Sequence, residues 1–397
     1  METETETKRV STGRVSTELH HGSHRHLVDV FPSEVAPVRP GVVDAIVVPT
    51  IRHHRWLRHA ARLAAALGCP LVSLHSRNWS SAENAAILMP QGVRFIAIDI
   101  DNPARLNLPD FETTALLKAT PFFRTTDLSS KRNTGLLLAR LMGWQRIVFL
   151  DDDIEVGGHE EVARAAALLD TYDVVGMNIG GYPDNSVVCH AHRLTGGQQD
   201  SFVGGGALAV ETTRSPSFFP NIYNEDWFYL LGETSLRRLA VTGKVAQRPY
   251  DPFDQPVRAR DQEFGDVLAE GVYWLLDGDD SGGWQAATDP AHWRRFLNRR
   301  RGFIEDVLHR VRRLPLGSTL SRQAVENSLL AALGRLNRID PEFCVCYLKA
   351  WVVDRRQWTA HLTKIPQLDS SATDAVKWLV KDGARQLRWW SSADMVR

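Results

Sequence analysis

Three consecutive carboxylates, Asp151-Asp152-Asp153, follow the apolar run 147–150. Like charges in close quarters repel one another, and desolvation raises each pKa, unless a cation compensates. In an extended segment, residues 151 and 153 point to the same side and residue 152 points away, so Asp151 and Asp153 can share one ligand while the protein holds Asp152. Carboxylate oxygens without nearby Cys or His favour Mn²⁺ or Mg²⁺ over zinc. An acidic loop that caps the next helix explains the triplet equally well.

A basic pair precedes the acidic triplet. Ser129-Ser130 predict a helix start, and Lys131-Arg132 come next, followed by an apolar pattern from Leu136 to Leu141. Cations in the first turn oppose the helix dipole, so an anion should offset them. A diphosphate would do so, and a solvated basic turn is the alternative for either cation alone.

Two segments after the triplet could complete a site. Gly204-Gly205-Gly206 stands just before an apolar strand, as expected where the backbone bends or approaches a ligand closely, although a simple turn also explains it. Glu225-Asp226 precedes a predicted helical run from Phe228 to Leu239. The helix dipole stabilises carboxylates there, but in a cleft one of them could deprotonate an attacking hydroxyl.

The elements that must position these residues are short β-branched runs that alternate with helices. Strands are predicted at 44–49, 71–75, 94–99, 146–151 and 173–178, and the helix from Trp56 to Leu67 should end at Gly68. This pattern predicts an α/β fold with a mostly parallel sheet flanked by helices. Ligands of such sheets bind beyond the carboxyl ends of the strands. Those positions hold Pro49-Thr50, Ser76-Arg77, Asp99 to Asp101 and Asp151 to Asp153.

The chain divides into three predicted parts. Residues 1–40 lack apolar periodicity and predict a flexible tail, whose four histidines (His20, His21, His24 and His26) have no second ligand group to close a metal site. Residues 41–280 form the α/β domain, and 281–397 form a helical C-terminal region. The tryptophans of that region (Trp351, Trp358, Trp378, Trp389 and Trp390) favour core packing over a membrane-surface or partner face.

Composition narrows the class of protein. Lys+Arg and Asp+Glu are equal at 47 each, which gives no indication of nucleic-acid binding. The four cysteines show no CxxC spacing, which favours a reducing compartment. No apolar run approaches the roughly 20 residues that span a bilayer, and the N-terminus is acidic. We therefore expect a cytoplasmic protein without a transmembrane segment, for which peripheral membrane contact stays open.

The order of these motifs resembles GT-A glycosyltransferases, particularly those of family 2. The resemblance covers about residues 42 to 276 and lies in the order of short motifs: Val48-Pro49-Thr50, Lys131-Arg132-Asn133, Asp151-Asp152-Asp153, Gly204-Gly205-Gly206 and Asn224-Glu225-Asp226. It implies a Rossmann-like domain that binds a nucleoside diphosphate sugar and transfers the sugar to an acceptor hydroxyl with Mn²⁺ or Mg²⁺.

The resemblance also implies roles for individual residues. Asp151 and Asp153 match the two acids of the DxD motif, the first near the ribose and the second on the metal, and Asp226 beside Glu225 matches the base of an inverting transfer. The implied donor-binding set is Pro49, Thr50, Ser76, Asp99, Lys131, Arg132, Asp151, Asp152 and Gly205, with Asp101 as a further candidate.

Two departures from the family pattern stand out. The segment 243–250 lacks the His that often completes the metal site, and the second strand ends in Ser76-Arg77-Asn78-Trp79 without the usual acidic residue. The segment from Pro109 to Leu128, which carries Arg124, and the C-terminal helices are expected on the acceptor side.

Two rival functions remain open at this point. Ala97-Ile98-Asp99-Ile100-Asp101 suggests a phosphatase of the haloacid dehalogenase type, although Asn102-Pro103 follow where a small hydroxyl residue or Gly is usual. A catalytically inactive module that binds a sugar or nucleotide would keep the same fold.

Overall fold

The protein is described by a computed structural model that covers residues 27–29, 39–77, 79–180, 186–197, 203–278, 282–314, 321–366 and 371–392. The four histidines of the expected N-terminal tail, and most of that tail, lie outside the described residues.

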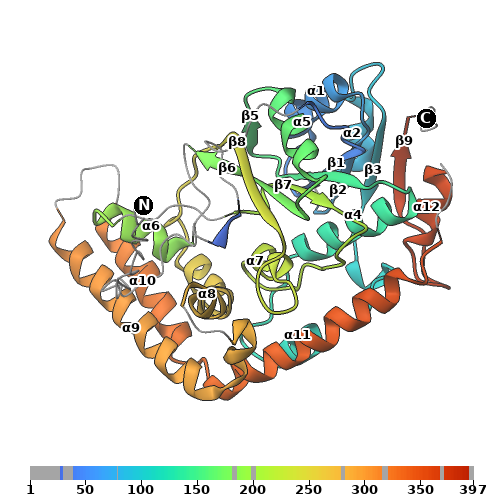
Figure 1. Cartoon of the computed structure of the whole chain (residues 1–397). Coiled ribbons are helices and arrows are strands. Elements are labelled where there is room, and N and C mark those ends of the chain that lie inside the picture. The colour runs from blue at the N-terminus through green and yellow to red at the C-terminus, as the bar shows by residue number, and fades with distance from the viewer. Residues whose placement is uncertain are drawn as a thin grey trace, which may run out of the picture.

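The described strands form one sheet in the order β5-β8-β6-β7-β4-β1-β2-β3-β9 (Figure 1). Their bounds are β1 (Ala45–Thr50), β2 (Leu71–His75), β3 (Phe95–Asp99), β4 (Arg146–Leu150), β5 (Ile154–Val156), β6 (Val174–Gly180), β7 (Ala207–Glu211), β8 (Leu239–Gln247) and β9 (Arg388–Ser391). The α/β prediction is confirmed, and each strand expected from the sequence up to residue 178 is present within one or two residues.

The expectation of a mostly parallel sheet is only partly met, because the sheet is mixed. Strands β4, β1, β2 and β3 are parallel, and so are β6 and β8. Strand β7 is antiparallel to both of its neighbours, and β5 and β9 are antiparallel edge strands. The helix between β6 and β7, α6 (Val187–Leu194), packs on C-terminal helices and does not cross the sheet, so the chain returns antiparallel. A continuous hydrophobic run indicates that a strand is buried on both faces of the sheet. It does not indicate whether that strand is parallel or antiparallel to its neighbours.

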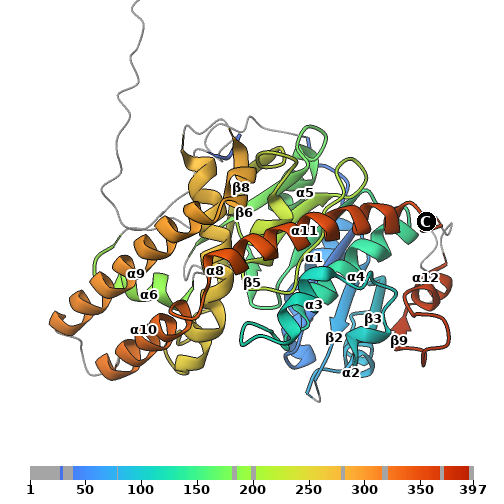
Figure 2. The ribbon, with the colours of Figure 1, turned by 90° about the horizontal axis from the view of Figure 1, so that it is seen from below.

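Helices cover both faces of the sheet. Helices α1 (Arg58–Leu67), α2 (Ala82–Ile87) and α5 (His159–Leu168) pack on one face, and α4 (Leu128–Leu141) packs on the other together with the C-terminal helices. The other helices are α3 (Glu112–Lys118), α7 (Glu225–Leu230), α8 (Pro256–Asp277), α9 (Pro290–Arg313), α10 (Arg322–Leu336), α11 (Pro341–Leu362) and α12 (Ala372–Trp378), with short 3-10 turns η2 (His54–Leu57), η3 (Pro103–Arg105) and η4 (Gly283–Thr288). Figure 2 shows α11 running beside α3, and α11 also packs on α9, which groups with α8 and α10.

Helix boundaries follow the sequence where local signals are strong. Helix α1 ends at Gly68 in the left-handed conformation (φ 64°), as predicted. The helical run expected from Phe228 to Leu239 is wrong, because α7 ends at Leu230 and Leu239 begins β8. Residues 228–231 are all buried, so no amphipathic period marks where the helix stops.

The start of α4 also differs from the prediction. The N-cap residue is Asp127 and not a serine, and the Ser129 hydroxyl donates to the Pro220 carbonyl at 2.7 Å. This hydroxyl therefore ties the helix start to the segment that precedes α7 and does not satisfy a backbone N–H of its own helix.

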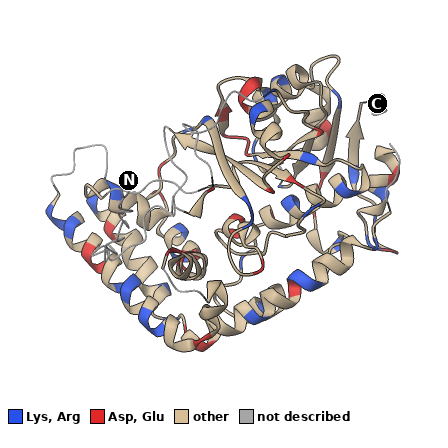
Figure 3. Cartoon of the chain, viewed as in Figure 1, with Lys and Arg blue, Asp and Glu red and all other residues tan. Residues whose placement is uncertain are grey.

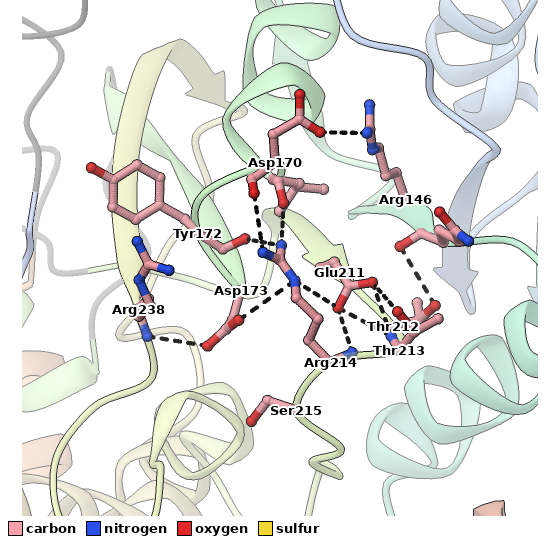
Figure 4. A network of polar contacts seen from close by, with 12 residues as sticks. Arg146, Asp170, Tyr172, Asp173, Glu211, Thr212, Thr213, Arg214, Ser215 and Arg238 are labelled. Atoms are coloured by element: carbon pink, nitrogen blue, oxygen red, sulfur yellow. Dashed lines mark hydrogen bonds and ion pairs between the residues drawn. The ribbon is translucent and has the colours of Figure 1, made fainter.

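Arg214 makes several hydrogen bonds at the end of the strands that lies away from the predicted site (Figure 4). The Arg214 guanidinium donates to the carbonyls of Tyr172 at 2.8 Å and Asp170 at 3.2 Å, and to that of Leu169. It also pairs with Glu211 at 3.3 Å. The guanidinium thus satisfies carbonyls at the end of α5 and fixes that helix to the end of β7.

The C-terminal region packs by its aromatic side chains. Trp351 and Trp358 of α11 are fully buried, as the core-packing interpretation predicts, whereas Trp378, Trp389 and Trp390 are only half-buried. Acidic and basic residues both occur along α9 and α11 (Figure 3), where pairs such as Arg294–Glu342 at 2.8 Å form. Within the described ranges, no helix is both long and apolar enough to cross a membrane.

Candidate active site

A cavity of about 510 Å³ opens at the carboxyl ends of β1 and β4. This volume lies in the range of small-molecule sites, roughly 300–1,000 Å³. Nine of the residues predicted to be catalytic, donor-binding or metal-binding line it: Pro49, Thr50, Lys131, Arg132, Asp151, Asp152, Asp153, Glu225 and Asp226. The cavity therefore brings together segments that are far apart in the chain, at the edge of the sheet where the fold predicts a ligand.

Four other candidate residues lie outside the lining, and one of them, Asp101, is exposed. Ser76 is buried behind it and accepts a hydrogen bond from Lys131 Nζ at 2.7 Å, while Gly205 lies between two lining glycines. Asp99 lies elsewhere: its Oδ1 accepts from the Ala82 backbone N–H at 2.8 Å, at the start of α2. Its Oδ2 faces the Arg388 guanidinium of β9 at 3.4 Å, so the structure gives Asp99 a position apart from the other candidates.

Arg132 is the buried cation at the centre of the site. It is 2% exposed and lies between two carboxylates, with Nη2 3.1 Å from Asp151 Oδ1 and Nη1 2.5 Å from Glu225 Oε1. Although burial opposes its charge, the carboxylates of Asp151 and Glu225 raise the pKa of Arg132 above its ordinary value. One guanidinium therefore joins helix α4, the end of β4 and the start of α7.

Gly205 is required by this arrangement because of space. A Cβ atom at residue 205 would overlap the guanidinium of Arg132. Its backbone N–H also donates to Asp226 Oδ2 at 2.6 Å. The glycine thus lets the backbone approach Arg132 closely enough to bind the neighbouring carboxylate.

Asp152 is held by side chains at the end of β1, whereas Asp151 pairs with Arg132. Its Oδ2 accepts from the Thr50 hydroxyl at 2.5 Å, and its Oδ1 accepts from Arg52 Nη1. The second guanidinium nitrogen of Arg52 lies 2.9 Å from Asp153 Oδ2. Burial raises the pKa of Asp152 and of Asp153, although Arg52 opposes both shifts.

Arg52 was not among the residues predicted from the sequence. It lies two residues after β1, in the kind of position that the strand-end rule favours, but the residues predicted there were only Pro49 and Thr50. Its side chain is 43% exposed and lies over the Trp56 ring, with its Cζ 5.3 Å from the ring centre. Arg52 is therefore the cation beside the triplet that remains accessible from the cavity.

Lys131 fixes the ends of two strands. Its ammonium donates to the Thr50 carbonyl at 2.9 Å and to the Ser76 hydroxyl at 2.7 Å, and pairs with Asp127 at 3.3 Å. Burial lowers the pKa of Lys131, although Asp127 opposes the shift. The side chain is 1% exposed, so it reaches the cavity wall from behind the ends of β1 and β2.

Glu225 and Asp226 form a carboxylate pair at the start of α7. Asp226 accepts hydrogen bonds from the backbone N–H of Gly205 at 2.6 Å and of Trp227 at 2.9 Å. Desolvation raises the pKa of Glu225 to about 7 in spite of Arg132, and it raises the pKa of Asp226 as well. Since the two carboxylates lie next to each other, the pair takes up protons as a unit.

The excess of acidic over basic side chains in the cavity fits a divalent cation. Eight carboxylates and six basic side chains line the cavity: Asp127, Asp151, Asp152, Asp153, Glu225, Asp226, Asp266 and Glu270 against Arg52, Arg77, Arg124, Lys131, Arg132 and Arg258. The upward pKa shifts mark carboxylates whose desolvation these cations do not offset. Within the part of the chain that the structure describes, no three His, Cys, Asp or Glu side chains converge as a complete metal site. A metal here would need further oxygens from its ligand.

Most of the residues that β8, the segment after it and α8 contribute to the cavity lining were not predicted from the sequence. Gln247 at the end of β8, Tyr250 after it, and Arg258, Asp266 and Glu270 of α8 line the cavity there. Spacings of four residues place Asp266 and Glu270 on one face of a helix, which was the available signal. Arg124, expected on the acceptor side, also lines the cavity.

No protein-family model matches the chain, and no curated protein matches it. Solved structures resemble it distantly. The mannosyltransferase PcManGT from Pyrobaculum calidifontis, in complex with GDP-Man and Mn²⁺, shares 14% identity at a TM-score of 0.39, over 83% of this chain and 90% of that chain. A protein from Desulfovibrio desulfuricans G20 described as a nucleotide-diphospho-sugar transferase shares 12% identity at a TM-score of 0.29, over 64% of this chain and 98% of that chain.

The packing of Gly205 gives a test of the site. Gly205→Ala would displace Arg132 from between Asp151 and Glu225, and breaking such a buried pair should lower the free energy of unfolding by about 3 kcal/mol. Gly204→Ala is the matched control, because its Cβ would meet only the Ile179 side chain, at 3.2 Å. We expect that control to cost about 1 kcal/mol or less. Urea denaturation measures both, and equal losses would contradict the role of Gly205.

Proposed function

We propose that the protein is a metal-dependent glycosyltransferase that moves a sugar from a nucleoside diphosphate sugar to an acceptor hydroxyl with inversion. The observation that carries the proposal is the bridge through Arg132, which joins the acidic strand end at Asp151 to the carboxylate pair at Glu225 in one cavity. A single side chain, that of Arg132, therefore contacts both the group that would bind a diphosphate and the carboxylate pair that contains the candidate base. The motif order that resembles GT-A enzymes agrees with this arrangement.

The donor end of the proposed site is the acidic strand end with its cations. Asp151 and Asp153 would hold Mn²⁺ or Mg²⁺, which supplies neutralisation of charge on the diphosphate leaving group. Arg52 is the accessible cation next to the triplet, and it would contact the diphosphate once its partner Asp153 binds the metal. Thr50 and Arg52 each hold one oxygen of Asp152, so that carboxylate would orient Arg52 and leave the metal to Asp151 and Asp153.

Asp226 is the proposed general base. It would take the proton from the acceptor hydroxyl as that oxygen bonds to the anomeric carbon and the bond from this carbon to the diphosphate oxygen breaks. The two backbone N–H groups that donate to Asp226 hold its carboxylate in place. Glu225, 6% exposed and paired with Arg132, sets the electrostatic surroundings of the base.

The phosphatase alternative finds less support. Asp99 would be its nucleophile, but Asp99 caps α2 and does not line the cavity. The inactive-module alternative differs from an enzyme only in turnover, so it becomes an outcome of the assay.

The assay combines a panel of UDP- and GDP-sugars with Mn²⁺ and measures nucleotide release with and without EDTA. Asp226→Asn should lower kcat by at least about 100-fold and leave donor affinity unchanged, because the base acts only in the chemical step. Asp153→Asn should instead abolish the part of donor binding that EDTA removes. Asp110→Asn, whose side chain is 95% exposed, is the matched control and should behave as wild type. Donor binding without nucleotide release for any acceptor would favour the inactive module.

The pH profile gives a second test. The pKa of Glu225 is raised to about 7 and that of Asp226 is raised with it, so the pair gains a proton as the pH falls below about 7. A base must be deprotonated, and kcat/KM should therefore fall on the acid side of that pH. Glu225→Gln removes the neighbouring negative charge and should move the acid limb to lower pH. An acid limb that stays in place in this variant would contradict the coupling of the pair.

A further inference from the structure

The residue that precedes the carboxylate pair has an unusual backbone. Asn224, the N-cap residue of α7, lies in the left-handed region with φ 60° and ψ 37°. Among the described residues, Arg77 is the one other non-glycine residue with positive φ. Such a conformation persists where surrounding contacts enforce it, and it is found preferentially at functional sites.

A buried carboxylate binds the side chain of Asn224, and a buried guanidinium holds that carboxylate in place. Its Nδ2 donates to Asp266 Oδ1 at 2.9 Å, and the other carboxylate oxygen of Asp266 accepts from Arg300 Nη2 at 3.0 Å. A carboxylate can only accept, so the amide nitrogen of Asn224 must face it. The side chains of Asp266 and Arg300 are 2% and 1% exposed.

Arg300 is itself fixed. Its Nε and Nη2 donate to the two oxygens of Glu263 at 2.9 and 3.0 Å, which gives a bidentate pair between α9 and α8. The position of Asp266 is therefore set by a guanidinium that has little freedom to move.

Helix α8 also holds the chain on both sides of the carboxylate pair. At Gly265 the helix contacts the Tyr223 carbonyl so closely that a Cβ atom would overlap it. Eight residues further along the helix, the Tyr273 hydroxyl donates to the Trp227 carbonyl at 2.9 Å. The segment that contains Glu225 and Asp226 is thus clamped at residues 223, 224 and 227.

We infer that Arg300, Asp266 and Asn224 form a positioning relay by which the C-terminal helices orient the Glu225–Asp226 pair. The inference rests on the proposed function for its catalytic consequence, but the ordering of α7 is independent of it. The physical reason is that the start of a short helix has little intrinsic stability, and its first residues follow the conformation of the N-cap residue. A displacement of Asp226 by about 1 Å would cost on the order of 100-fold in turnover.

A reciprocal swap tests the relay in the full chain. Asn224→Asp keeps the shape of the side chain but sets a carboxylate against Asp266, so kcat should fall on the order of 100-fold. The double variant Asn224→Asp, Asp266→Asn restores one donor and one acceptor across the contact, while the new asparagine oxygen still accepts from Arg300. Its kcat should recover to within about 10-fold of wild type. Affinity for the sugar nucleotide should not change in either variant.

Hydrogen exchange of the peptide that spans residues 223–231 provides a readout that does not depend on activity. Exchange should speed up in Asn224→Asp and return toward the wild-type rate in the double variant. If wild-type protein turns over no sugar nucleotide, the proposed function fails while the exchange data still decide the relay. The relay is overturned if the double variant exchanges as fast as Asn224→Asp, or if Asn224→Asp exchanges like wild type. Weaker donor binding with unchanged exchange would also overturn it, by giving Asn224 a direct ligand contact.

Discussion

The site depends on the burial of one guanidinium, that of Arg132, between the carboxylates of Asp151 and Glu225. Removing these charges from water is costly, and the cost is offset only if they meet at hydrogen-bonding distance. This requirement fixes the distance between the end of β4 and the start of α7. It also explains why residue 205 is a glycine, since any side chain there would occupy the space of the guanidinium. The same glycine binds Asp226 through its N–H, so the position of the candidate base follows from the position of the arginine.

The three basic side chains near the acidic strand end differ in their exposure to solvent. Arg132 and Lys131 are buried and organise the protein, whereas Arg52 lies at the surface of the cavity and pairs with Asp152 and Asp153. A buried cation serves as a fixed part of the scaffold, while an exposed one can exchange its partner when a ligand binds. The acidic strand end thus combines a rigid side, toward α7, and an adaptable side, toward the loop after β1. That combination suits the diphosphate binding and release that we propose for the site.

The sequence predicted the elements that carry the strongest local signals. The strands β1 to β4 and β6, and the end of α1 at Gly68, are recognisable because continuous apolar runs and a C-terminal glycine depend on neighbouring residues alone. The antiparallel entry of β7 was not predictable in this way, since it results from the packing of α6 on distant helices. Asp99 was selected because it ends a strand, yet its carboxylate is used to cap α2. The Arg300–Asp266 pair joins residues 34 positions apart on two helices, and only the tertiary structure shows that it reaches Asn224.

The most direct test of the central claim is a crystal structure of the protein with Mn²⁺ and a nucleoside diphosphate, with anomalous scattering used to locate the metal. We expect one manganese peak within about 2.0–2.6 Å of carboxylate oxygens of Asp151 or Asp153, with the diphosphate bound beside Arg52 in the same cavity. Manganese and nucleotide bound elsewhere, or a cavity that stays without both at saturating concentrations, would contradict it.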